Sequence, residues 1–283
     1  MRLFLLTALV MTAFAANSML NRAALAMDLA DPVGFAAIRV ASGCAMLAVL
    51  LFCGPSRPRT LARPNLIAVS GLTLYLLGFS FAYTSLDTGL GALILFGGVQ
   101  VTMFLAGLAA GESIPRRRWL GMGVSMCGLA LLLWPGEGGR LPIAGAVLMA
   151  AAALGWGLYS FVGRRVAHPL PATFWNFVYA LPFVALAWLL TGTGQKVQPA
   201  GIALACASGA LASGLGYALW YAILPRLGSS TAALAQLSVP VIAAAMGLVF
   251  LGEAISLQMV LAAGLVLGGI WAGITPQRAA EQR

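Results

Sequence analysis

Apolar stretches about as long as a lipid bilayer is thick follow one another along the chain, and most of the charge lies in short segments between them. A helix needs about 20 apolar residues to cross the hydrocarbon core of a membrane. Of the 283 residues, 61% are hydrophobic and 8% are charged, whereas about a quarter of the residues in a soluble domain are charged. Such a chain cannot cover a water-facing surface, so we expect an all-α membrane protein.

The length divides into ten such spans with short connections, which leaves no room for a soluble domain that would catalyse a reaction or bind DNA. Glycine and proline within the spans do not argue against them, because small residues favour helix packing in membranes. The expected spans are 3–23, 34–53, 65–84, 88–110, 117–134, 141–162, 172–190, 199–224, 230–251 and 256–274.

The basic residues predict the direction of the spans, because cytoplasmic loops are enriched in Lys and Arg. If the N-terminus is cytoplasmic, twelve basic residues lie inside, and two, Arg140 and Lys196, lie outside. Both termini are therefore expected in the cytoplasm. The twelve are Arg2, Arg57, Arg59, Arg63, Arg116, Arg117, Arg118, Arg164, Arg165, Arg226, Arg278 and Arg283. Since they are scattered over short loops, the net charge of +9 predicts contact with the lipid bilayer and no nucleic-acid partner.

A repeat relates the two halves of the chain. The pattern Gly-Glu-x-Ile closes the fourth expected span at residues 111–114 and the ninth at residues 252–255, an offset of 141. An offset of 142 relates Arg22, after the first span, to Arg164, after the sixth. The sequence therefore predicts that each half contains five equivalent spans.

Five is an odd number, so the second repeat must cross the membrane in the opposite direction to the first. Equivalent loops agree with this, because a loop that is acidic in one half is basic in the other. We expect two inverted five-helix repeats, at residues 1–136 and 137–283, around a central cavity. This architecture is typical of secondary transporters, whose substrate site lies near the membrane midplane between the repeats.

These features resemble the drug/metabolite transporter superfamily, and in particular its EamA-type ten-helix members. The resemblance covers nearly the whole chain and rests on the paired Gly-Glu-x-Ile helix ends, on Pro240 thirteen residues before Glu253, and on the Gly-rich fifth and tenth spans. In one departure, Gln100 stands where the second repeat has Pro240. Within the superfamily the chain is most similar to the bacterial exporters of aromatic amino acids.

The resemblance implies a transporter of the bacterial inner membrane. An enzyme is not expected, because the spans contain no His, no carboxylate pair and no H-E-x-x-H motif. The resemblance implies a cavity lined by the first, third, fourth, sixth, eighth and ninth spans, with the fifth and tenth at the periphery. It also implies export of small metabolites, with aromatic or other hydrophobic amino acids as the expected substrates.

Polar and aromatic residues on the lining spans are the candidates for substrate binding, because an amino acid needs a few polar groups in an otherwise apolar cavity. Trp156 and Tyr159 share a face of the sixth span, and the third span carries aromatic residues at every fourth position. Each candidate has a plain alternative as a contact between helices. The candidates are Asn17, Ser18, Tyr75, Phe79, Tyr83, Gln100, Trp156, Tyr159, Ser213, Tyr217, Trp220, Gln236 and Ser238. Gly97, Gly98 and Pro240 are candidate gating residues, since glycine allows close approach and proline frees a carbonyl.

The expected spans carry no Asp or Glu near their middle, although proton-driven carriers usually keep a titratable group there. We therefore predict facilitated export by rocking of the two repeats, with no metal or cofactor. Arg39 is the most deeply placed charge, and we expect it to pair with Asp28 or Asp31 or to attract a substrate carboxylate.

The sequence leaves open the transported solute and the number of chains in the transporter. The transported solute could instead be a nucleoside or an amphipathic drug, and transport could be antiport. We expect a monomer or a weak dimer. Gly264 and Gly268 form a small-xxx-small step in the last span, which favours close packing within the chain and, as the alternative, contact with a second copy.

Overall fold

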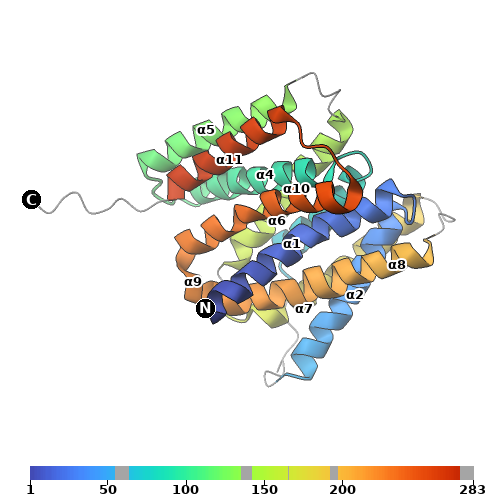
Figure 1. The fold of residues 1–283 in the computed structure, drawn as a ribbon. Helices are drawn as coiled ribbons and strands as arrows, with labels where there is room; N and C mark the ends of the chain where they lie inside the picture. Colours follow the sequence, from blue (N-terminus) through green and yellow to red (C-terminus); the bar gives the residue numbers. More distant parts are fainter. Residues whose placement is uncertain (55–63, 135–141, 165, 192–196, 275–283) are drawn as a thin grey trace, which may run out of the picture.

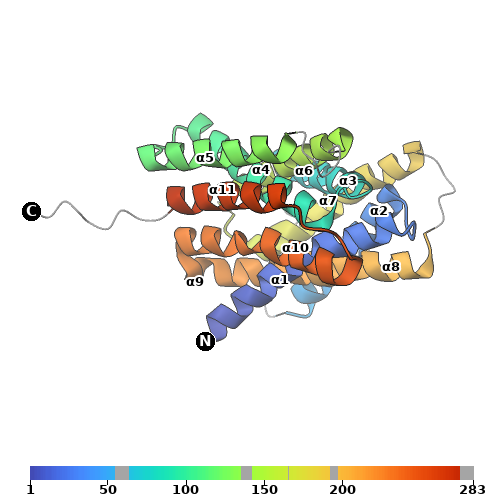
Figure 2. The same ribbon diagram turned by 45° about the horizontal axis from the view of Figure 1, so that its top comes forward.

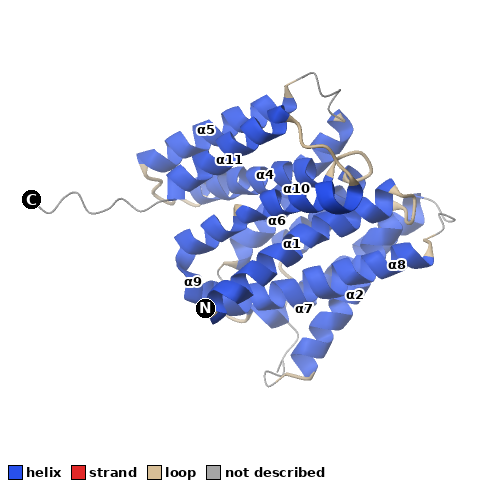
Figure 3. Ribbon diagram, viewed as in Figure 1, coloured by secondary structure: helices blue, strands red, loops and turns tan. Residues whose placement is uncertain are grey.

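The computed structural model describes residues 1–54, 64–134, 142–164, 166–191 and 197–274, and every regular element in these ranges is a helix (Figure 3). The elements are α1 (Arg2–Ala26), α2 (Pro32–Phe52), α3 (Leu66–Ala82), α4 (Thr88–Ala109), α5 (Arg116–Leu133), α6 (Ile143–Gly163), α7 (Pro169–Thr191), α8 (Pro199–Cys206), the π-helix η1 (Ala207–Leu215), α9 (Gly216–Gln236), α10 (Ser238–Leu251) and α11 (Leu257–Ile274).

Helices α1 to α7 and α11 match the expected spans to within three residues at either end. Local chemistry sets several of these boundaries. The carboxylate of Asp31 accepts hydrogen bonds from the first amides of α2, and the side chain of Asn65 accepts one from the Ala68 amide at the start of α3. Both side chains are N-caps, which satisfy amides that have no partner inside the helix.

The eighth and ninth spans are divided differently from the prediction. The sequence predicted a connection between residues 224 and 230, whereas helical backbone continues through η1 and α9 to Gln236, and α10 begins at Ser238. Pro240 explains the position of the break. It has no N–H to donate to the carbonyl of Gln236, four residues earlier, so the helix is interrupted there.

Six segments of the described residues are long and apolar enough to cross a membrane, namely α1, α2, α4, α6, α7 and residues Pro199–Leu224. Helices α3, α10 and α11 are apolar but shorter, and α5 begins with three arginines. The chain is therefore a multi-pass helical membrane protein. The number of ten spans stays a prediction.

Most basic residues that predict the orientation lie outside the described residues, as does the boundary between the two predicted repeats. They are Arg57, Arg59, Arg63, Arg140, Arg165, Lys196, Arg278 and Arg283. In both ribbon views the start of α1 and the end of α11 lie at the same end of the bundle (Figures 1 and 2). Placing that end in the cytoplasm remains a prediction.

The two halves of the chain interlock. Helix α6 packs against α3 and α4 of the first half, while α1 packs against η1 and α10 of the second half. Helices α5 and α11 lie along each other at one side of the bundle (Figures 1 and 2). These contacts are reciprocal, as two inverted repeats would require, and the repeats themselves stay a prediction of the sequence.

Apolar side chains cover much of the surface and polar side chains lie inside, as expected for a protein surrounded by lipid. Large apolar side chains such as Leu120 and Val249 are exposed, whereas Asn17, Arg39 and Ser213 are buried. In a bilayer the polar groups must find partners inside the protein, because the lipid offers none. The buried polar groups are therefore the candidates for a functional site.

Glycines fix the contact between α5 and α11. A Cβ on Gly269 would meet the backbone and side chain of Ser125 in α5, the amide nitrogen at 2.8 Å. Gly264 and Gly268 would meet nothing within 4 Å. Neither glycine is therefore needed for close packing against the described residues. The prediction that they pack closely within the chain is wrong for this part of the structure.

Candidate substrate site

Four aromatic rings meet where the two halves of the chain come together. The ring of Trp156, on α6, lies 4.9 Å from that of Tyr75 on α3, 5.0 Å from that of Tyr217 on α9 and 5.4 Å from that of Tyr159. The small Gly155 and Gly157 flank Trp156 and let α6 approach its neighbours closely. The cluster is an aromatic surface on which a flat apolar group can pack.

A chain of hydrogen bonds runs beside these rings. The amide nitrogen of Asn17 donates to the hydroxyl of Tyr75 at 3.2 Å, and the Ser208 hydroxyl donates to the amide oxygen of Asn17. All three residues are buried. The chain links α1, α3 and η1, so each half of the sequence supplies part of it.

The π-helix η1 places two serines in this interior. Ser208 bonds Asn17, and Ser213, five residues later, accepts a hydrogen bond from Arg39. In an α-helix, two residues five apart point in different directions. In a π-helix, residue i bonds to residue i+5, so the two hydroxyls lie on nearly the same face. π-Bulges often occur at functional sites.

Arg39, on α2, is fully buried behind the aromatic cluster. Its Nε donates to Ser213 Oγ at 3.2 Å and its Nη2 to the Tyr75 hydroxyl at 2.8 Å. The guanidinium carbon lies 5.1 Å from the ring centre of Tyr75 and 5.0 Å from that of Phe79. It is not paired with Asp31, which instead caps α2, and Nη1 forms no hydrogen bond with any residue that the structure describes.

Two cavities flank the aromatic cluster. The smaller, of about 20 Å³, is lined by Phe14, Asn17, Ser18, Tyr75, Phe79, Leu95, Phe96, Trp156 and Tyr217. It has room for about one water molecule. The larger, of about 210 Å³, is lined by Asn65, Ala68, Tyr159, Val162, Gly163, Val166, Pro169, Ala172, Thr173, Trp175, Asn176 and Tyr221. Since Tyr159 contacts Trp156, the two cavities adjoin through these rings.

The structure brings together eight of the thirteen predicted binding residues. Six of them line the smaller cavity, Tyr159 lines the larger one, and Ser213 holds Arg39. The Tyr83 hydroxyl donates instead to the carbonyl of Thr88, and Trp220 packs edge-on against Phe14. Gln100, Gln236 and Ser238 are partly buried but line neither cavity.

The predicted gating residues lie in helix contacts. A Cβ on Gly98 would meet Ala153 of α6 at 2.7 Å, and one on Gly97 would meet Leu129 of α5 at 3.1 Å. Pro240 is buried near the start of α10. The glycines set how closely α4 packs, and Pro240 sets where the α9–α10 helix breaks.

Sequence reasoning missed several lining residues. Phe14 lies three residues before Asn17 and therefore on the same face of α1, a spacing that could have identified it. Thr173 and Asn176 lie near the start of α7, which was not among the spans expected to line the cavity. Ser208 is a polar residue on the eighth expected span and could have been identified by the same criterion as Ser213, although the sequence does not signal the π-helix that places both.

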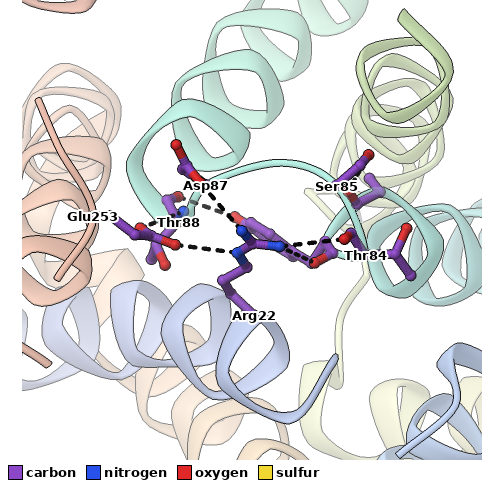
Figure 4. A network of polar contacts seen from close by, with 8 residues as sticks. Arg22, Thr84, Ser85, Asp87, Thr88 and Glu253 are labelled. Carbon is purple, nitrogen blue, oxygen red and sulfur yellow. Dashed lines mark hydrogen bonds and ion pairs between the residues drawn. The ribbon is translucent and has the colours of Figure 1, made fainter. Parts of the chain in front are cut away.

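An ionic network closes one end of this region. Arg22, on α1, forms ion pairs with Asp87 and Glu253, each at 3.2 Å (Figure 4). It also donates to the carbonyls of Tyr83 and Thr84 at the end of α3. The side chains of Arg22 and Glu253 are 17% and 11% exposed, so much of this network is shielded from solvent.

Glu253 also closes the start of α4, since its second carboxylate oxygen accepts a hydrogen bond from the Thr88 amide at 2.8 Å (Figure 4). The carboxylate thus lies at the N-terminus of α4, where a negative charge is favourable. Its ion pair with Arg22 was not expected.

A second ion pair lies at the opposite end of α4. Arg164, after α6, lies 3.3 Å from Glu112, which follows α4, and the two side chains are 40% and 36% exposed. The larger cavity opens at this same end, because it is lined by Gly163 and Val166. The two ends of the central region therefore differ. The Arg22 network at one end is largely shielded from solvent, whereas the other end has the exposed Arg164–Glu112 pair and the larger cavity.

The two Gly-Glu motifs have the same local structure. Gly111 and Gly252 adopt φ angles of +75° and +68°, which glycine tolerates at a helix C-terminus. The amide of Glu112 donates to the carbonyl of Gly107, five residues earlier, at 3.0 Å. The amide of Glu253 donates to the carbonyl of Gly247, six residues earlier, at 3.1 Å. The motif thus turns the chain at the helix end and directs the glutamate toward its arginine.

A bundle of apolar helices around a buried polar and aromatic centre is the architecture of a membrane transporter. The comparisons with known proteins agree. The model of the EamA-like transporter family matches residues 143–274. The uncharacterized protein PA1977 of Pseudomonas aeruginosa is 47% identical over 99% of this chain and 98% of its own length. The second half of the chain, residues 143–274, therefore carries an EamA-like transporter domain.

More distant relatives carry a functional description. A protein of Salmonella typhimurium is 26% identical over 75% of this chain and 79% of its own length, and one of Escherichia coli is 23% identical over the same shares. Each is described as a probable amino-acid metabolite efflux pump. A solved crystal structure of another protein matches the fold with a TM-score of 0.65 and 20% identity, over 94% of this chain and 96% of its own.

Proposed function

We propose that the protein exports small metabolites, and aromatic or other hydrophobic amino acids in particular, across the bacterial inner membrane. The observation that carries this proposal is the cluster of Trp156, Tyr75 and Tyr217 beside the hydrogen-bonding groups of Asn17 and Ser208. The rings offer a surface for an apolar side chain, and the polar groups fix orientation, as in small-molecule sites generally. The description of the relatives as amino-acid metabolite efflux pumps supports this substrate class.

The mechanism that we propose is alternating access, in which the Arg22 network at one end of the bundle opens when the opposite end closes. Arg22 and Glu253 close the end predicted to face outward, while the larger cavity reaches the end of Arg164 and Glu112, predicted to face the cytoplasm. This is the state in which a substrate enters from the cytoplasm. Release then requires the Arg22 network to open and the Arg164 end to close.

Transport by purified protein in liposomes tests the proposed substrate class. We expect saturable flux of labelled tryptophan or phenylalanine, and less flux of alanine, because alanine has no ring to pack on Trp156. Trp156→Ala should lower the aromatic flux by about tenfold, since a well-packed aromatic contact contributes on the order of 1 kcal/mol beyond its buried area. Trp156→Phe is the matched control and should retain most of it. Flux of a nucleoside in place of amino acids would contradict this substrate class.

Energy coupling forms a separate prediction. The residues that line the two cavities include no Asp, Glu or His, so this part of the site offers no side chain that would carry a proton at neutral pH. We expect amino-acid flux to follow the substrate gradient and to be unchanged when a pH gradient is imposed. Uphill accumulation driven by a pH gradient, at equal substrate concentrations on both sides, would refute facilitated transport.

A further inference from the structure

The charge of Arg39 has no partner of opposite charge in the part of the chain that the structure describes. An arginine stays protonated under all ordinary conditions, and the ion pairs among the described residues involve Arg22 and Arg164. Arg39 is fully buried within a protein whose surroundings are lipid. A buried cation without a counterion is costly, and ionisable groups kept inside membranes commonly mark substrate paths.

The groups that hold Arg39 are neutral. A serine hydroxyl accepts from Nε, a tyrosine hydroxyl accepts from Nη2, and Nη1 has no acceptor among the described residues. Nη1 and Nη2 are the two nitrogens with which a guanidinium can bind both oxygens of a carboxylate. A carboxylate adds an opposite charge and a second, parallel bond to what the single Tyr75 hydroxyl offers, so a carboxylate would displace that hydroxyl.

The position of Arg39 relative to the small cavity allows this exchange. Tyr75 and Phe79 line that cavity, and the same two rings lie against the guanidinium. Arg39 therefore sits directly behind the cavity wall. With about 20 Å³ the cavity is too small for an amino acid, so any substrate must move a wall residue. A shift of Tyr75 enlarges the cavity and frees Nη2 in one movement.

We propose that Arg39 is the carboxylate-binding residue of the transport site and that it selects solutes bearing a carboxylate beside an apolar group. This inference rests on the proposed function and makes it more specific. The apolar group packs on Trp156, and the carboxylate replaces the Tyr75 hydroxyl on Nη1 and Nη2. Nucleosides and cationic amphipathic drugs, which lack a carboxylate, are thereby disfavoured.

A series of phenylalanine analogues tests the proposal in liposomes containing the whole protein. The probes are phenylalanine, its amide, phenethylamine and 3-phenylpropionate, which separate the carboxylate from the ammonium group. We expect the wild type to transport phenylalanine about 10- to 100-fold faster than the amide, because hydrogen bonds to charged groups contribute about that factor. Arg39→Gln should remove this preference, so that phenylalanine and its amide are transported at similar rates, whereas Arg39→Lys should keep part of it.

The outcomes separate this proposal from the proposed function. Equal transport of phenylalanine and its amide by the wild type would overturn the role of Arg39 and leave amino-acid export intact. Transport of 3-phenylpropionate alone would support Arg39 but replace amino acids by simple carboxylates. Absence of flux for all four probes would overturn both. The wild-type series decides these points even if the Arg39 variants fail to fold, and thermal unfolding of each variant identifies such a failure.

Discussion

Replacing Arg22 with glutamine is expected to open the end of the bundle that Arg22 closes. The substitution leaves Glu253 and Asp87 without their shared counterion and removes the bonds to the end of α3. Breaking a partly buried charge pair shifts an equilibrium by on the order of 2 kcal/mol, about a 30-fold change in the ratio of closed to open states. Export should fall strongly, because the closed state can no longer be held while substrate enters.

Thiol labelling measures this opening. The four native cysteines are replaced, and Ser80, which is fully buried in α3 three residues before Tyr83, is changed to cysteine. A membrane-impermeant maleimide added on the side of Arg22 should react about tenfold faster in the Arg22→Gln protein than in the parent. Arg164→Gln is the matched control at the opposite end of α4 and should not raise this rate. An unchanged rate in Arg22→Gln would show that the network is not a gate.

The second large effect is expected at Gly155. A Cβ there would collide with the backbone carbonyl of Gly71 and lie 2.8 Å from the amide nitrogen of Tyr75. Both are backbone atoms of α3 and cannot move without moving the helix. Gly155→Ala should therefore destabilise the protein by about 1–3 kcal/mol, the usual cost of overpacking, and should displace Tyr75 from Trp156.

Thermal unfolding in detergent and transport in liposomes measure the two consequences. We expect a lower midpoint and a marked loss of aromatic amino-acid flux for Gly155→Ala. Gly264→Ala is the matched control, because nothing lies within 4 Å of its added methyl group and alanine favours helix by about 1 kcal/mol. Equal stability of the two variants would mean that α3 and α6 do not rely on the close approach at Gly155.

Hydropathy predicted helices α1 to α7 and α11 to within three residues. At α2 and α3 local chemistry also marks the start, since Asp31 and Asn65 cap these helices. The connection after residue 224 was misplaced, because the break depends on the missing N–H of Pro240, a residue expected inside the ninth span. Hydropathy does not show where a proline interrupts an apolar helix.

For the site, helical spacing predicted which aromatic residues share a face but not which faces meet. Tyr75 and Phe79 were identified because they recur every four residues, and their contact with Arg39 depends on how α2 packs against α3. The repeat predicted that Arg22 corresponds to Arg164 and Glu112 to Glu253. It could not reveal that each arginine takes the glutamate of the other half, because pairing across the repeats is a matter of tertiary structure.

The composition of the Arg22 network bears on how the protein is made. The ribosome delivers Arg22 and Asp87 to the membrane long before Glu253 has been synthesised, and Arg22 pairs with both acids in the finished protein. Asp87 can thus neutralise Arg22 while the second half is still being inserted. The Asp87 carboxylate, 50% accessible in the final structure, therefore supplies Arg22 with a counterion that does not depend on the second half of the chain.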